Sequence, residues 1–380
     1  MLTGINFSPP LYFLFNFCLQ LVLPTSIEQL RLQSLIFIII GIVLSFFLTR
    51  KIFGNTVAFL STILVASQSD LLISQAQEAR HYAMFFTCGA FVLYTQSLKD
   101  DTVKKHKSLI FLTHFSLCHT HYLGIIFSGL AGLSNLISNK EKPITKRIPL
   151  PVLAVWIFSL PSYLLLLSKQ SSHLGNWPKP NELSDLLASY NSSLLFITII
   201  IPTLALIILN KSNRHTETSK IKEICCSRPV MITSFLWIFV PFLVWIISNL
   251  TPLNLFVVRY FIPMEASVVF LVGFILSFII RKLHKQTSKS ITMFITLALS
   301  VIIVLISSKR ASFGLKKDTN YHHSLIIEET YHASEKPIIL EGDHIFFPNA
   351  YLTNDEYILL VDDTKLHTKY KSFSNKLKIK

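Results

Sequence analysis

The chain has 380 residues, of which 51% are hydrophobic and only 15% are charged, and its mean hydropathy is +0.52. A soluble domain carries about a quarter charged residues, so this composition argues against an ordinary soluble protein and indicates a surface that faces lipid. The formal net charge of +14 lies in short basic clusters between apolar runs. That pattern is typical of cytoplasmic loops, and no nucleic-acid partner is predicted.

The first segment, 1–29, contains an apolar part at 10–23 that is short for a hydrocarbon core about 30 Å thick. Pro9 and Pro10 stand before it, and proline suits the first turn of a helix. We therefore predict an outer segment whose helix lies in the membrane interface. The alternative, that this segment crosses the membrane, stays open.

The middle of the chain, 30–307, is predicted to be a transmembrane domain, because it contains a series of apolar runs of the length that a spanning helix needs. The predicted spans are 30–50, 55–74, 80–98, 149–168, 192–209, 230–248, 261–280 and 291–307. A further apolar stretch, 108–138, is 31 residues long and is interrupted by His119, Thr120, His121 and Tyr122.

The distribution of basic residues predicts how this long stretch folds. The loops 50–56, 99–107, 139–148, 210–229 and 281–290 hold 19 Lys or Arg, whereas 1–31, 74–80, 169–191 and 249–260 hold five. For the 19 to share the cytoplasmic side, the stretch 108–138 must be a hairpin of two short helices that turns near His119–Tyr122 on the outer side. The predicted fold class is therefore an all-α polytopic membrane bundle of about ten transmembrane helices.

The same rule makes the span 30–50 run from outside to inside, so a preceding helix that would carry segment 1–29 across the membrane is expected but missing. The tail, 308–380, follows an outward span and is polar. Its run 336–347 (KPIILEGDHIFF) and the later run YILLV are strand-like. We predict a small α/β extracytoplasmic domain there.

Polar residues gather between two predicted spans in the segment 75–82, which includes Glu78, Arg80 and Tyr82. A simple reading is that Glu78 caps a helix or pairs with Arg80. Five polar groups in one turn exceed what capping requires, and intramembrane polar residues are usually functional.

The hairpin turn carries His119, His121 and Tyr122. Histidines two apart do not share a helix face, but on a turn both could reach a site where they bind metal or phosphate, or act as acid and base. The simpler alternative is a pair of structural histidines satisfied inside the protein.

A third outer motif is Arg259-Tyr260, just before Pro263. The planar guanidinium of arginine suits phosphate. The alternative is an arginine at a helix end that reaches the lipid head groups.

These motifs, in this order, resemble the GT-C class of membrane glycosyltransferases, and in particular the branch of dolichyl-phosphate-mannose–protein mannosyltransferases and aminoarabinose transferases. The resemblance covers residues 6 to about 280. The matching residues are Pro9-Pro10-Leu11-Tyr12, Arg31-Leu32-Gln33-Ser34, Arg50-Lys51-Ile52-Phe53-Gly54, Gln77-Glu78-Ala79-Arg80-His81-Tyr82, Thr120-His121-Tyr122, and Arg259-Tyr260 with Pro263.

The resemblance implies transfer of a sugar from a polyprenyl-phosphate-linked donor to an acceptor hydroxyl on a glycan, lipid or protein, at the outer face of the plasma (inner) membrane. It implies Glu78 as a catalytic carboxylate that assists the acceptor. Phosphate and substrate contacts are expected from Arg80, Tyr82, His119, His121, Tyr122, Arg259 and Tyr260. Glu78 and His121 could also hold a divalent metal, Mg or Mn.

One departure from the family pattern bears on activity. The principal acidic residue of the family follows a first transmembrane helix, and residues 1–8 contain no Asp or Glu. The expectation is a truncated or inactive copy of such an enzyme. The alternative function is a non-catalytic membrane transporter or lipid-binding protein.

Overall fold

The fold was analysed in a computed structural model, which describes residues 10–22, 27–78, 80–98, 107–138, 150–174, 183–190, 228–251 and 255–286, together with three short strands. The chain divides into two compact units, Met1–Val304 and Leu305–Lys380. The described part of the first unit is helical. The predicted spans 192–209 and 291–307 lie outside the described residues, so the count of ten crossings stays a prediction.

The first half of this unit runs from α1 to α8. Its helices are α1 (Leu11–Gln20), α2 (Ile27–Phe53), α3 (Asn55–Gln68), α4 (Asp70–Gln77), α5 (Tyr82–Gln96), α7 (Lys107–Thr120) and α8 (Gly124–Ser138). Helix α1 begins directly after Pro10, as the two prolines predicted. Gly54 separates α2 from α3 with φ at +91°, a left-handed conformation that favours glycine.

The second half contains the remaining described helices of the unit. They are α10 (Leu150–Leu174), α11 (Leu183–Ser189), α15 (Arg228–Ile238), α16 (Val240–Leu250), the 3-10 helix η2 (Val258–Phe261) and α17 (Met264–Gln286). By length and apolarity, Gln29–Phe53 and Arg228–Leu250 each qualify as a membrane span, and the bent pair α3–α4 qualifies if it counts as one.

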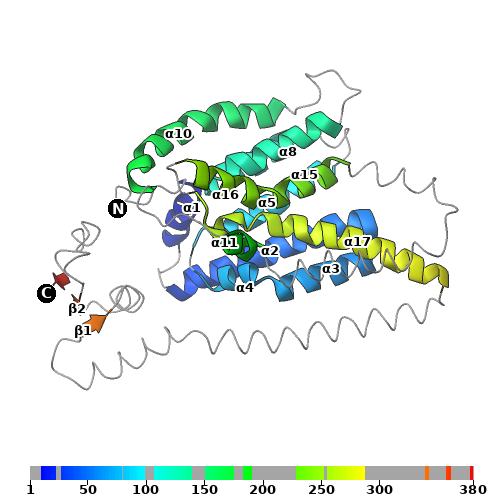
Figure 1. Ribbon diagram of the computed structural model, residues 1–380, viewed down its shortest axis with the longest axis horizontal. Coiled ribbons are helices and arrows are strands. Elements are labelled where there is room, and N and C mark those ends of the chain that lie inside the picture. The colour runs from blue at the N-terminus through cyan, green and yellow to red at the C-terminus, as the bar shows by residue number, and fades with distance from the viewer. Residues whose placement is uncertain are drawn as a thin grey trace. The chain divides into compact units, whose positions relative to one another are not determined.

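Helix α5 is the centre of the bundle. It packs against α2, α7, α8, α15 and α17, and nearly all of its residues from Tyr82 to Thr95 are buried. A helix that is apolar on all sides is expected in such a position. Several of these helices lie side by side in Figure 1. The outer helices α2, α10 and α16 expose large apolar side chains, as a surface in contact with hydrocarbon requires.

The predicted hairpin at 108–138 is confirmed. Helices α7 and α8 pack against each other, and the chain reverses at residues 121–123, where the Gly124 N–H donates to the His121 carbonyl at 2.8 Å. A side chain at Gly124 would place its Cβ 2.0 Å from the carbonyl oxygen of Leu117. The close backbone approach of the two helices therefore depends on glycine.

Replacing Gly124 by alanine is expected to destabilise the protein by about 1–3 kcal/mol. The added Cβ would clash with a backbone carbonyl, which cannot move away by changing rotamer as a side chain can. Thermal unfolding in detergent measures this. Gly129→Ala is the matched control on the same helix, since nothing lies within 4 Å of its added Cβ. Equal melting temperatures for the two variants would show that the hairpin tolerates a side chain at position 124.

The predicted span at 55–74 is broken in the structure. Helices α3 and α4 meet at an angle of 67°. Ser69 lies at the break with extended backbone, and its hydroxyl accepts a hydrogen bond from the Leu72 N–H. A serine that caps a new helix competes with continuation of the old one, which explains the bend.

The second unit contains a parallel sheet of order β1-β2-β3, formed by Ile339–Glu341, Tyr357–Leu360 and Leu377–Ile379. Ile339 pairs with Ile358, and Tyr357 pairs with Leu377. Strands β1 and β2 fall in the two runs that the sequence predicted as strands. The helical part of the predicted α/β domain lies outside the described residues.

Candidate functional site

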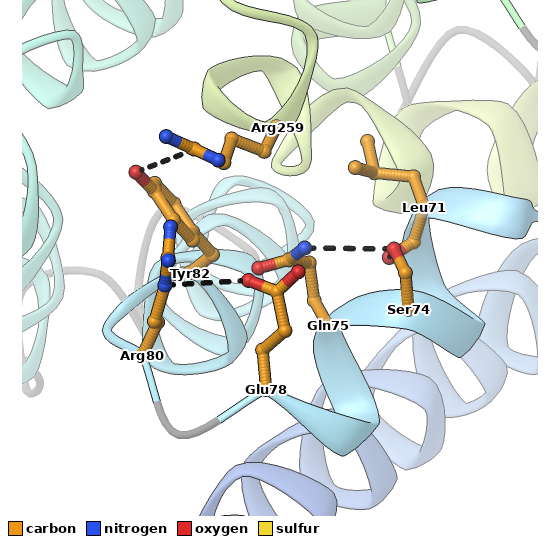
Figure 2. Close-up of polar contacts among 7 residues, drawn as sticks. All are labelled: Leu71, Ser74, Gln75, Glu78, Arg80, Tyr82 and Arg259. Atoms are coloured by element: carbon orange, nitrogen blue, oxygen red, sulfur yellow. Dashed lines mark hydrogen bonds and ion pairs between the residues drawn. The ribbon is translucent and has the colours of Figure 1, made fainter. Parts of the chain in front are cut away.

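Glu78 and Arg80 lie where α4 ends and α5 is about to begin. Glu78 has extended backbone and ends α4, so it is not an N-terminal helix cap. The Arg80 Nε lies 3.5 Å from the Glu78 Oε2 (Figure 2), and the two side chains are 51% and 40% exposed. This pair forms the half-exposed layer of the site.

Arg259 reaches the same place from a distant part of the chain. It lies in η2, and its Nε donates a hydrogen bond of 3.0 Å to the hydroxyl of Tyr82, which is 177 residues away in sequence (Figure 2). Its guanidinium carbon is 5.5 Å from the centre of the Tyr82 ring. The guanidinium also interacts electrostatically with Glu78. Arg259 is thus tied into the bundle, which favours a place in the site over an arginine that reaches the lipid head groups.

An aromatic layer lies beneath these charges. The His121 ring is centred 4.5 Å from Tyr260, 5.8 Å from Tyr82 and 4.2 Å from Tyr122. Tyr260 also contacts Tyr82 and Tyr122, with ring centres 5.8 and 5.3 Å apart. His121 is buried, and its Nδ1 accepts a hydrogen bond from the Leu123 N–H, so its Nε2 carries the proton.

His81 belongs to this layer, although the sequence analysis did not select it. Its ring stacks on His121 with centres 5.3 Å apart and lies 6.0 Å from the ring of Tyr12 on α1. Its Nε2 is buried without a hydrogen-bond partner. The only signal in the sequence was its place between two selected residues, Arg80 and Tyr82.

His121 carries no charge at neutral pH. Burial, with His81 and Arg259 adding to it, lowers the pKa of His121. A histidine with a lowered pKa is uncharged at neutral pH, so the positive charge of the site comes from Arg80 and Arg259. His121 can donate a hydrogen bond to a phosphate but adds no charge.

The site therefore contains most of the predicted residues: Glu78, Arg80, Tyr82, His121, Tyr122, Arg259 and Tyr260. His119 is the exception. Its Nε2 lies 3.1 Å from the Ser159 hydroxyl on α10, and its ring packs on Phe115, with centres 4.2 Å apart. His119 lies in the last turn of α7 and faces α10. His121 lies in the turn after the helix and is buried inside the bundle. The prediction of a substrate contact at His119 is therefore not supported by its position.

Glu78 and His121 were predicted to hold a divalent metal. Within the described ranges, no three His, Cys, Asp or Glu side chains form a group that could hold a metal ion. Mg²⁺ prefers six oxygen ligands, whereas these residues offer one carboxylate and one imidazole beside two arginines. The donor set does not fit a resident Mg²⁺ or Mn²⁺ well, and no step below uses one.

The chain has the GT-C-like membrane fold that its motifs predicted. It is similar to two solved structures of ArnT from Cupriavidus metallidurans, one bound to undecaprenyl phosphate and one in the apo state. Each match has a TM-score of 0.58 and 12% sequence identity, and covers 97% of this chain and 79% or 78% of the ArnT chain. No family model matches the sequence, and no curated protein matches it. The likeness establishes the fold of an integral membrane protein.

Proposed function

We propose that this protein transfers a sugar from a polyprenyl-phosphate-linked donor to an acceptor hydroxyl at the outer face of the inner membrane. The observation that carries the proposal is the meeting of Arg80, Arg259 and Glu78 at one end of a GT-C-like bundle. One of the ArnT structures with this fold binds undecaprenyl phosphate. A polyprenyl phosphate is therefore the ligand that we assign to this cluster.

The charge of the site suits a phosphate leaving group. In the transfer, the acceptor oxygen forms a bond to the anomeric carbon, and the bond from that carbon to the phosphate oxygen breaks. The phosphate leaves with the electron pair, and two guanidinium groups stabilise the charge that develops on it. Arg259 is held toward this position by the Tyr82 hydroxyl.

Glu78 supplies the carboxylate for the other half of the reaction. We assign to it the hydrogen bond from the acceptor hydroxyl and the proton that this hydroxyl loses. Its 40% exposed side chain is open to an acceptor from outside the bundle. The aromatic layer of Tyr82, His121 and Tyr260 excludes water from below, which strengthens the electrostatic interactions above it.

A reconstitution experiment tests this function. The full chain in lipid nanodiscs is supplied with undecaprenyl-phosphate-linked sugars and candidate acceptors, and the release of undecaprenyl phosphate is measured together with its binding. We expect binding and release. Binding without release for any sugar would favour the alternative of a non-catalytic lipid-binding protein, and the absence of both would reject the proposal.

The orientation is tested separately. Ser74 and Asn55 are exposed and lie in the opposite ends of the α3–α4 pair. In a chain without its native cysteines, we expect Ser74→Cys to react with a membrane-impermeant thiol reagent added outside, and Asn55→Cys to react only after permeabilisation. The reverse pattern would place the site on the cytoplasmic face.

A further inference from the structure

Buried polar atoms without hydrogen-bond partners gather where α1 meets α2 and the start of α5. Tyr12 on α1 is only 5% exposed, and the centre of its ring lies 6.0 Å from that of His81. Among the described residues, neither the Tyr12 hydroxyl nor the His81 Nε2 has a hydrogen-bond partner of normal geometry. Such atoms are unfavourable inside a protein unless something else pairs with them.

Helix α2 contributes a third atom of this kind. Gln33 is 6% exposed, and its Nε2 donates a hydrogen bond of 2.7 Å to the Oδ1 of Asn16. Asn16 lies one turn after Tyr12 on α1 and also interacts with the Tyr12 hydroxyl, but its Oδ1 is turned to Gln33. The other amide atom, Gln33 Oε1, is buried and has no hydrogen-bond partner in the part of the chain that the structure describes.

Two contacts between α2 and α5 place Gln33 at the level of the site. The Thr87 hydroxyl on α5 donates to the Phe37 carbonyl on α2. Further along both helices, the Lys51 ammonium donates to the Ser97 carbonyl at 2.5 Å. The two helices therefore run in the same direction. Because Gln33 precedes Phe37 by one turn, it lies level with the first turn of α5.

The three unpartnered atoms together favour a ligand with hydroxyl groups. A tyrosine hydroxyl donates and accepts, an imidazole nitrogen does either according to its tautomer, and an amide oxygen only accepts. An ionised phosphate or carboxylate cannot donate to Gln33 Oε1, and an ammonium group would be repelled by Arg80 and Arg259. A hydroxyl group both donates and accepts, so it is able to pair with all three.

We propose that Tyr12, Gln33 and His81 bind hydroxyl groups of the sugar on the polyprenyl-phosphate-linked donor, and thereby select the sugar that is transferred. The proposal rests on the transferase function proposed above. His81 stacks on His121 and follows Arg80 directly in the sequence, so these atoms adjoin the place assigned to the phosphate. The sugar is bonded to that phosphate, and its hydroxyl groups therefore lie beside it. Aromatic walls with a few polar groups that fix orientation are typical of small-molecule sites.

Binding of two matched kinds of lipid by the full chain in nanodiscs tests the proposal. One kind is undecaprenyl phosphate linked to a hexose, a pentose or an N-acetylhexosamine. The other is undecaprenyl methyl phosphate, which has the same charge but no sugar. We expect the wild type to bind at least one of the sugar lipids more tightly than the methyl lipid. Tyr12→Phe and His81→Phe keep an aromatic ring but remove the polar atom. Each should weaken binding of that sugar lipid by roughly 3–10-fold, the loss of one hydrogen bond, and leave binding of the methyl lipid unchanged.

Tyr94→Phe is the matched control, because it removes a tyrosine hydroxyl near the opposite end of α5 and should change neither affinity. The melting temperature without lipid is a second readout. Since the Tyr12 hydroxyl is unpartnered, Tyr12→Phe should not lower Tm, and a clear fall would overturn the proposal by showing that the hydroxyl is satisfied inside the protein.

Two results of the binding assay would also overturn it: sugar lipids that bind no more tightly than the methyl lipid, or variants that weaken both kinds of lipid equally. Either result leaves the phosphate site in place. A wild-type chain that binds neither kind of lipid would instead reject the transferase function, and the sugar site with it.

Discussion

Replacing Arg259 by alanine is expected to reduce sugar transfer by roughly 10²–10³-fold, the usual effect of removing one group that stabilises developing negative charge. Binding of undecaprenyl phosphate should weaken by about 10–100-fold, because a hydrogen bond to a charged group is lost. The reason is geometric: Arg259 interacts with Glu78 and with the Tyr82 hydroxyl, so it lies where the phosphate is expected.

Two further variants test whether the loss of binding and transfer is specific to the guanidinium of Arg259. Arg50→Ala removes an exposed arginine in the last turn of α2, at the opposite end of that helix from the site, and should leave binding and transfer unchanged. Arg259→Lys keeps the charge but loses the planar fork, and should recover only part of the binding. If Arg259→Ala binds the lipid phosphate as well as Arg50→Ala does, the phosphate is held elsewhere.

Replacing Glu78 by glutamine is expected to separate binding from chemistry. Transfer should fall by about 10²–10⁴-fold, the contribution of a general base. Binding of undecaprenyl phosphate should be kept or become tighter, because one negative charge leaves the neighbourhood of Arg80 and Arg259. The measurement is single-turnover release of undecaprenyl phosphate beside an equilibrium binding assay on the same preparation.

The matched control is Gln77→Ala, which changes the exposed neighbouring residue at the end of α4 and should preserve transfer. Unchanged transfer in Glu78→Gln would remove the catalytic role assigned to Glu78. Loss of lipid binding in the same variant would instead indicate that Glu78 holds Arg80 in the position that binds the lipid phosphate.

The sequence by itself determined the approximate positions of most of the described helices and of the hairpin. Apolar runs of spanning length and the bias of basic residues are local properties, and they correctly predicted the α7–α8 reversal near His121. They also placed Glu78, Arg80, His121 and Arg259 at the same ends of alternating helices. Segments that alternate in direction must bring these ends to one layer, so the membership of the site was largely predictable.

Only the tertiary structure decided which side chains contact one another and which of them are buried. His119 and His121 are two residues apart, yet one faces Ser159 and the other joins Tyr260, because the helix ends between them. The hydrogen bond from Arg259 to Tyr82 joins residues 177 positions apart, and no local propensity specifies such a contact. The His81 ring stacks on His121 and lies 6.0 Å from the ring of Tyr12, and both contacts join elements distant in sequence. The burial of Glu265 likewise follows from tertiary packing around α17, since hydropathy reports how apolar a segment is but not which neighbour covers it.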